Sequence, residues 1–112
     1  MRYLVTGTYV EPGPLLPPDR VVDMLEKIVL PSLQNLAKME QDGKVLAGGI
    51  HVAGRVGTMI VEADSNEEVD RLIGKLPFWG LLRWTVTPLV SFNDRAKWEG
   101  ELIKEMKKSV AG

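Results

Sequence analysis

The sequence of 112 residues contains no cysteine and a single histidine. The lack of cysteine excludes disulfides, thiolate metal sites and thiol nucleophiles together. The histidine has no second histidine at helical spacing, the carboxylates are scattered, and glycine-rich phosphate-binding motifs are absent. A serine in a sharp strand-to-helix turn is missing as well. We therefore expect a protein that uses no metal and no other cofactor.

The charge balance and the apolar runs bear on the class of partner. There are 14 basic and 15 acidic residues, so no field of one sign would attract nucleic acid or an anionic membrane. No apolar run approaches the roughly 18 residues of a membrane span. The first ten residues have the pattern of a strand rather than that of a signal peptide. The simplest expectation is a cytoplasmic protein that binds neither nucleic acid nor membranes.

The residue pattern is that of one α+β domain over residues 1–112, with a core in residues 1–92. Runs rich in β-branched and aromatic residues predict strands over residues 3–10, 44–52, 56–63 and the last part of 76–92. Apolar residues at helical spacing predict helices over residues 19–41, from Ser65 to Pro77, and over about 94–110. The order βαββαβ followed by a helix predicts a ferredoxin-like fold with an antiparallel sheet.

Three local signals refine the helices. Pro31 lies inside the first helix and predicts a kink or break near Leu30. Ser65 and Glu68 have the spacing of a capping box at the start of the second helix. The pair Asn93-Asp94 offers a cap for the C-terminal helix.

The segment of residues 76–92, LPFWGLLRWTVTPLVSF, holds two of the three tryptophans and both phenylalanines. Pro88 within it predicts an edge strand, a bulge or a point where the strand changes partner, because proline has no N–H for the ladder. We expect the sheet face without helices to be apolar, and the proline-rich loop 11–18 to need cover. A second copy of the chain would supply that cover, so we predict a homodimer or a larger homo-oligomer.

With this order of elements, the chain resembles the muconolactone isomerase-like family of the dimeric α+β barrel superfamily over about residues 1–92. The resemblance is carried by Leu76-Pro77-Phe78-Trp79-Gly80-Leu81-Leu82, by Trp84 to Leu89, and by Asp42-Gly43 leading into a strand that ends Ile50-His51-Val52-Ala53-Gly54. It implies two ferredoxin-like units that pair into one barrel. The apolar second strand, the loop 11–18 and the C-terminal helix depart from the family pattern.

The resemblance also implies a cofactor-free isomerase of aromatic hydrocarbon catabolism. Such an enzyme shifts a double bond in a small unsaturated lactone or carboxylic acid, which needs a base and donors for the enolate. His51 is the candidate proton shuttle, because an imidazole ordinarily titrates near neutral pH. Tyr3 and Tyr9 are candidates to polarise the carbonyl. Glu11 and Glu62 are the bases to consider if His51 is inert.

Arginine and tryptophan side chains are the candidates for binding the substrate. Arg83, in an otherwise apolar run, and Arg55 could each hold a carboxylate in a bidentate fork. Trp79 and Trp84 could wall an apolar pocket. Each candidate also has a structural alternative, which is an interface ion pair for the arginines and core or interface packing for the tryptophans.

Two other functions are open at this point. A cofactor-independent monooxygenase of the same superfamily would use an apolar pocket to activate an aromatic substrate towards oxygen. A non-catalytic oligomer would keep the barrel and would bind a ligand or serve a structural role. Oxygen consumption would identify the first function, and tight binding of a metabolite without turnover would identify the second.

Overall fold

The computed structural model describes residues 1–10 and 17–111, so Glu11 and most of the proline-rich loop lie outside the described part of the chain. Four antiparallel strands form one sheet in the order β2-β3-β1-β4. The elements in chain order are β1 (Arg2–Tyr9), α1 (Pro18–Met24), the π-helical turn η1 (Leu25–Val29), α2 (Leu30–Gln41), β2 (Val45–Ile50), β3 (Val56–Glu62), α3 (Asn66–Gly74), the 3-10 turn η2 (Trp79–Leu81), β4 (Leu82–Leu89) and α4 (Phe92–Ala111). This arrangement confirms the predicted ferredoxin-like fold.

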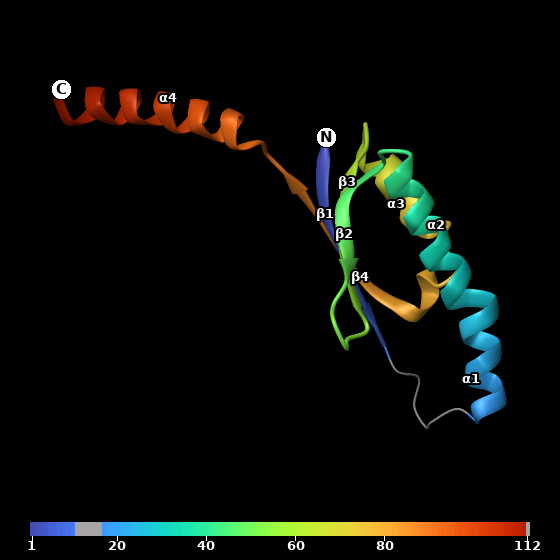
Figure 1. The fold of residues 1–112 in the computed structure, drawn as a ribbon. Coiled ribbons are helices and arrows are strands. Elements are labelled where there is room, and N and C mark those ends of the chain that lie inside the picture. Colours follow the sequence, from blue (N-terminus) through green and yellow to red (C-terminus); the bar gives the residue numbers. More distant parts are fainter. Residues whose placement is uncertain (11–16, 112) are drawn as a thin grey trace.

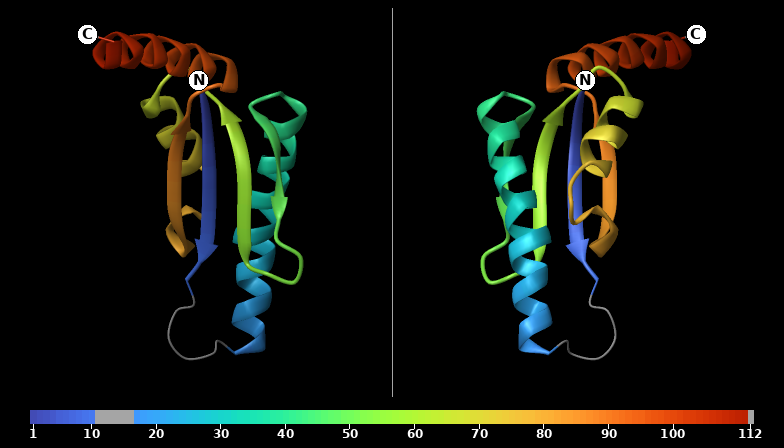
Figure 2. Two further views of the ribbon diagram at one scale, coloured as in Figure 1. Left: turned by 90° about the vertical axis from the view of Figure 1, so that its left-hand side faces the viewer. Right: turned by 90° about the vertical axis from the view of Figure 1, so that its right-hand side faces the viewer.

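Helices α1, α2 and α3 cover one face of the sheet, and α4 extends away from its other side (Figure 1). Viewed onto the sheet, β1 and β3 are the central strands (Figure 2). The core lies between the sheet and the helices, because alternate strand residues point to that side and meet the apolar faces of the helices. Its buried members are Tyr3, Val5, Val45, Met59, Val61, Ala63, Val69 and Ile73.

The two edge strands differ in how they end the sheet. β4 pairs with β1 and forms one edge, which confirms the position predicted from Pro88. β2 forms the other edge, and its register against β3 is irregular. An added Cβ at Gly48 would lie 2.6 Å from the Thr58 carbonyl oxygen, whereas nothing lies within 4 Å of one at Gly49. The backbone of β3 therefore approaches β2 closely at Gly48 and not at Gly49.

Helices α1 and α2 are joined through η1 into one continuous helical arm. The interruption predicted near Leu30 takes the form of a π-helical turn, which separates α1 from α2 without ending the arm. The Leu30 N–H donates to the Leu25 carbonyl, five residues earlier, so the helix is wider just before Pro31. This wider turn gives room to the Pro31 ring, which in a regular α-helix would clash with the carbonyl four residues earlier.

Ser32 fastens the helical arm to the segment that leads into β4. Its side chain is fully buried. The hydroxyl donates to the Ile28 carbonyl at 2.8 Å and accepts the Phe78 N–H at 3.0 Å. The second bond joins parts of the chain that are 46 residues apart, and it satisfies a backbone donor that is buried away from water.

Ser32→Ala is expected to lower the free energy of unfolding by about 1–3 kcal/mol, because it leaves the buried Phe78 N–H without an acceptor. Urea denaturation followed by circular dichroism measures the change. Ser109→Ala is the matched control, since Ser109 is exposed on α4 and its loss should change stability by less than about 0.5 kcal/mol. Equal denaturation midpoints for both variants would contradict the anchoring role of Ser32.

Serine side chains cap two helices. The Ser65 hydroxyl accepts the Glu68 N–H at 3.2 Å, and the Glu68 carboxylate accepts the Asp64 N–H at 2.8 Å. The predicted capping role of Ser65 is therefore confirmed. At the start of α4, the Ser91 hydroxyl accepts the Asp94 N–H at 3.0 Å. The cap predicted at Asn93-Asp94 is wrong, because Ser91 takes that role and the helix begins at Phe92.

The sheet face that carries no helix, the helix-free face, bears both polar and apolar side chains. Thr6 lies between Thr58 of β3 and Thr85 of β4, and directly paired residues share a face. The next row places Leu4 beside Ile60. The prediction of an apolar second face is therefore wrong, because threonines alternate there with aliphatic side chains.

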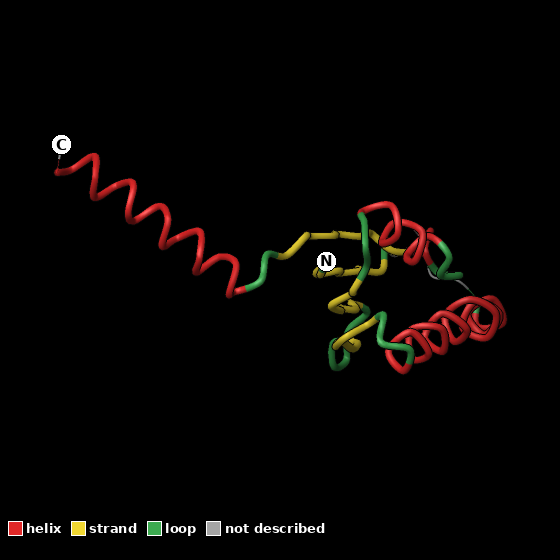
Figure 3. Tube along the Cα trace, turned by 90° about the horizontal axis from the view of Figure 1, so that it is seen from above, coloured by secondary structure: helices red, strands yellow, loops and turns green. Residues whose placement is uncertain are grey.

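Helix α4 projects from the end of β4 and brings the longest dimension of the molecule to 73 Å (Figure 3). None of its residues, Phe92–Ala111, is buried. Trp98 and Met106, two of the apolar residues at helical spacing in this helix, are 50% and 59% exposed. Among the described residues, no helix has both the length and the hydropathy needed to cross a membrane.

Candidate ligand-binding cavity

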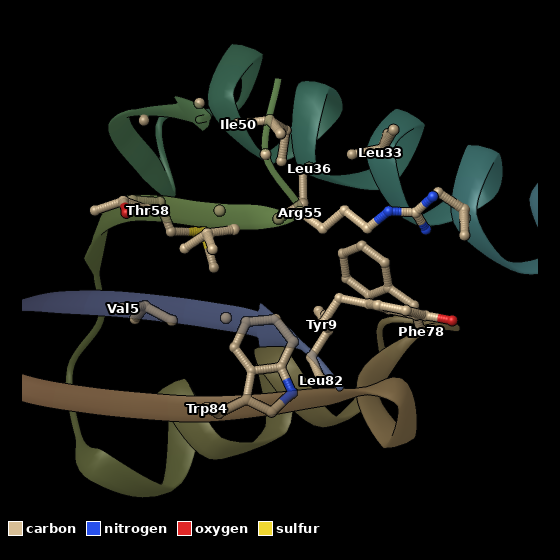
Figure 4. A pocket seen from close by; sticks show the side chains of 18 of the residues that line it. Val5, Tyr9, Leu33, Leu36, Ile50, Arg55, Thr58, Phe78, Leu82 and Trp84 are labelled. Atoms are coloured by element: carbon tan, nitrogen blue, oxygen red, sulfur yellow. The ribbon is translucent and has the colours of Figure 1, made fainter. Parts of the chain in front are cut away.

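A cavity of about 440 Å³ lies between the sheet and the helical arm of α1, η1 and α2. Strands β1, β2 and β3 form its floor, and the arm forms its roof. Phe78, Leu82 and Trp84 form the wall towards β4 (Figure 4). Most lining side chains are aliphatic or aromatic, and pockets of roughly 300–1,000 Å³ with such walls take small organic molecules.

Three residues with strong polar groups are among those that line the cavity, namely Tyr9, Arg55 and Glu40, and Glu40 is also exposed to solvent. The Arg55 guanidinium carbon lies 5.3 Å from the centre of the Tyr9 ring, a cation–π contact (Figure 4). The Tyr9 hydroxyl contacts the Met24 sulfur at 3.9 Å, which is a weak acceptor. In the described part of the chain, neither Arg55 nor Glu40 takes part in an ion pair. Both charges are therefore available to a ligand.

Glu40 was not among the residues predicted from the sequence. It follows Leu33, Leu36 and Ala37 on α2 at distances of seven, four and three residues, so all four share one helix face. All four also line the cavity. A carboxylate that continues an apolar helical stripe is the signal that would have found it. That signal is weak by itself, because solvated glutamates on helices are common.

Trp84 forms the wall of the cavity at the β4 side. Its indole lies over Gly7 of β1, where an added Cβ would come within 2.7 Å of the ring. The indole N–H donates to the Trp79 carbonyl at 3.0 Å, and the Phe78 ring lies 6.1 Å away with a 58° tilt. The missing side chain at Gly7 thus lets the indole approach the strand, and the other two contacts hold its orientation.

Tyr3, Trp79 and Glu62, which the sequence suggested for the site, do not line this cavity. Tyr3 is buried in the core, and its hydroxyl donates to the Asn66 side-chain oxygen at 3.0 Å. Trp79 is half exposed beside β4. Glu62 forms an ion pair with Arg2 at 3.6 Å. Within residues 1–10 and 17–111, no three histidine or carboxylate side chains are grouped so that they could hold a metal ion.

His51 and Arg83 lie on the helix-free face, opposite the cavity. The His51 imidazole is 2.8 Å from the Thr58 hydroxyl, and Arg83 pairs with Thr8 on that face. The register places His51 and Arg83 in one row, three strand spacings apart, so their backbones are separated by roughly 14 Å. Within one chain these two residues could share a ligand on the helix-free face, and not in the cavity.

The fold and the cavity define a class, a ferredoxin-like α+β domain with an apolar chamber between its sheet and its helices. No family model and no curated protein matches the sequence. Among solved structures, 5-chloro-2-hydroxyhydroquinone dehydrochlorinase from Burkholderia phenoliruptrix, in complex with 2,5-dihydroxybenzoquinone, has a similar fold. The TM-score is 0.54 at 21% identity, and the match covers 84% of this chain and 98% of the dehydrochlorinase. At that identity the likeness shows the fold alone.

Proposed function

We propose that this protein is an enzyme of small-molecule catabolism that binds a cyclic substrate between the sheet and the helical arm. The observation that carries the proposal is the composition of the cavity. Its described lining combines about 440 Å³ of apolar space with one guanidinium, one carboxylate and one phenol hydroxyl. Apolar walls favour an unsaturated ring, and the three polar groups supply an anion anchor, a base and a proton donor.

The chemistry that these groups support is proton transfer next to a carbonyl group, without a cofactor. Arg55 would hold a carboxylate or phenolate of the substrate. The Tyr9 hydroxyl would donate to the developing enolate, and Glu40 would remove the proton and return it elsewhere. A double-bond shift in an unsaturated lactone or carboxylic acid needs these three roles. A cytoplasmic isomerase similar to the muconolactone isomerase-like family is therefore our first proposal.

The dehydrochlorinase of similar fold supports the general class. Its name gives a hydroxylated chloroaromatic substrate, and its complex holds a dihydroxybenzoquinone. Both are small oxygenated rings of a size that a cavity of about 440 Å³ admits. The likeness supports an enzyme that acts on such a ring, and it favours no particular reaction.

A panel of unsaturated lactone acids, hydroquinones and chlorinated hydroquinones, incubated with the protein in D₂O and followed by NMR, tests the proposal. An isomerase is expected to move the double bond and to introduce deuterium at the carbon that accepts the proton. Oxygen uptake would establish the monooxygenase instead, and binding without turnover would establish the non-catalytic role. Arg55→Met should remove the binding of anionic compounds, whereas Arg83→Met, on the helix-free face, should not. The opposite result would place the site on the helix-free face.

We also expect a homodimer in which the helix-free faces of two copies meet, as the resemblance to dimeric α+β barrels implies. Leu4 and Ile60 on that face are only partly buried, and no residue of α4 is buried, and both observations support this assembly. Light scattering at micromolar concentration is expected to report twice the monomer mass. A stable monomer would remove both the dimer and the barrel.

A further inference from the structure

Helix α4 exposes an apolar stripe that no other described residue of the same chain buries. Trp98, Leu102, Met106 and Val110 recur every four residues and lie on one side of the helix. Trp98 is 50% and Val110 is 88% exposed. In proteins most helical stability comes from packing of such a face, so this helix needs a surface to pack against.

A groove beside β4 has an apolar lining that could cover the stripe of α4. It lies between α3 and the edge of the sheet and has a volume of about 480 Å³. Its apolar lining includes Val69, Ile73, Trp79, Trp84, Val86 and Pro88, and Glu67 and Asp70 of α3 add acidic groups. Trp79 and Val86 are 52% and 41% exposed, so the groove is open to another molecule along the edge strand.

The stripe can lie along β4 within the length of that strand, and the end of α4 and helix α3 carry opposite charges. The stripe from Trp98 to Val110 is about 18 Å long at 1.5 Å per residue, and β4 beside the groove is about 26 Å long at 3.3 Å per residue. Residues 104–111 of α4 contain three lysines and one glutamate, a balance of 3 − 1 = +2. Helix α3 contains three acidic residues and one arginine, a balance of 1 − 3 = −2. Opposite charges favour the end of α4 beside α3.

The direction of α4 indicates which copy of the helix fills the groove. The groove lies on the side of the sheet that carries α3, whereas α4 leaves β4 towards the opposite side (Figure 1). Only Val90 and Ser91 separate β4 from α4, so the helix would have to reverse its direction to reach its own groove. In a face-to-face dimer, a helix of about 30 Å can cross the roughly 10 Å between packed sheets and reach the helix layer beyond.

We infer that α4 of one copy of the chain occupies the α3–β4 groove of a second copy, with Trp98 and Met106 packed against Trp79 and Val86. Trp84 lines both this groove and the ligand cavity. The helix of one copy therefore supports the outer side of a wall whose inner side faces the ligand of the other. This inference rests on the proposed dimer and is independent of the proposed reaction.

Cross-linking between single-cysteine variants tests the inference, because the sequence has no cysteine of its own. Met106→Cys on the stripe is mixed with Val86→Cys in the groove, and a short bismaleimide is added. A cross-linked heterodimer of twice the monomer mass is expected. Lys97→Cys is the matched control, because it lies about 180° around the helix from Met106, and it should give no heterodimer with Val86→Cys.

Other outcomes overturn the inference. A link between two Met106→Cys chains would mean that two α4 helices pair with each other. A link within one chain that carries both substitutions, diluted into wild-type protein, would mean that α4 folds back on its own groove. No link at all would mean that the groove is empty. Light scattering tests the dimer independently of the cross-link. A dimer that gives no cross-link contradicts only the proposed contact of α4 with the groove. A monomer contradicts the proposed dimer as well.

Discussion

Glu40→Gln is expected to lower kcat by about 10²–10⁴-fold on the substrate that the protein turns over, the usual loss when a positioned base is removed. Glutamine keeps the size of the side chain but cannot take up a proton. KM should therefore change much less than kcat, because the substrate is still held by Arg55 and the apolar walls. The expectation rests on position, since Glu40 is the carboxylate that the described residues place at the cavity.

Two comparison variants separate Glu40 from other candidates. Glu26→Gln makes the same chemical change in the same helical arm, at an exposed residue outside the cavity lining, and should leave kcat unchanged. His51→Ala removes the proton shuttle expected from the sequence, and should also leave kcat unchanged, because the imidazole lies on the helix-free face. Steady-state kinetics on the three variants decides between them. A large loss for His51→Ala with normal activity for Glu40→Gln would move the reaction to the helix-free face.

Gly48→Ala is expected to lower the free energy of unfolding by on the order of 3 kcal/mol, the upper part of the range for overpacking. The added Cβ would lie 2.6 Å from the Thr58 carbonyl oxygen and 2.7 Å from the Met59 Cβ. Thr58 and Met59 belong to the strand that pairs with β2, so they cannot move away without disturbing the ladder. The expected strain is therefore concentrated at the edge of the sheet that contributes to the cavity floor.

The neighbouring substitution Gly49→Ala is the matched control. Nothing lies within 4 Å of a Cβ added there, and alanine restricts the unfolded chain, so stability should stay the same or rise by up to about 1 kcal/mol. Urea denaturation of the two variants gives the comparison directly. If both variants unfolded at the same concentration, the pairing of β2 with β3 at Gly48 would differ from the one described.

The order of the elements could be predicted because each depends on a short-range pattern. Ser65 and Glu68 mark a helix start by their spacing alone, and Pro88 indicates an edge strand because it lacks an N–H. Errors arose where several neighbours offer the same group. Ser91, Asn93 and Asp94 can all cap a helix, and local sequence does not rank them.

The members of the site were harder to predict, because side-chain direction in a strand reverses with every residue. Ile50 lines the cavity, and His51, the next residue, bonds to Thr58 on the helix-free face. The only histidine is an obvious candidate for proton transfer. The sheet face on which its side chain lies, however, depends on the register between β2 and β3. The opposite holds for Glu40, which the sequence did not suggest and which lines the cavity because α2 packs over the sheet.

The two sides of the cavity differ in what they contribute to the fold, and this difference bears on how specificity can diverge. Val5 and Met59 line the cavity and are also buried members of the core, so changes there alter binding and folding together. Met24, Leu25 and Val29 line the same cavity from α1 and η1, which contain no buried residue. Substitutions in those two elements can reshape the chamber while removing little buried surface. Descendants of this sequence can therefore acquire new substrates through the arm while the sheet stays unchanged.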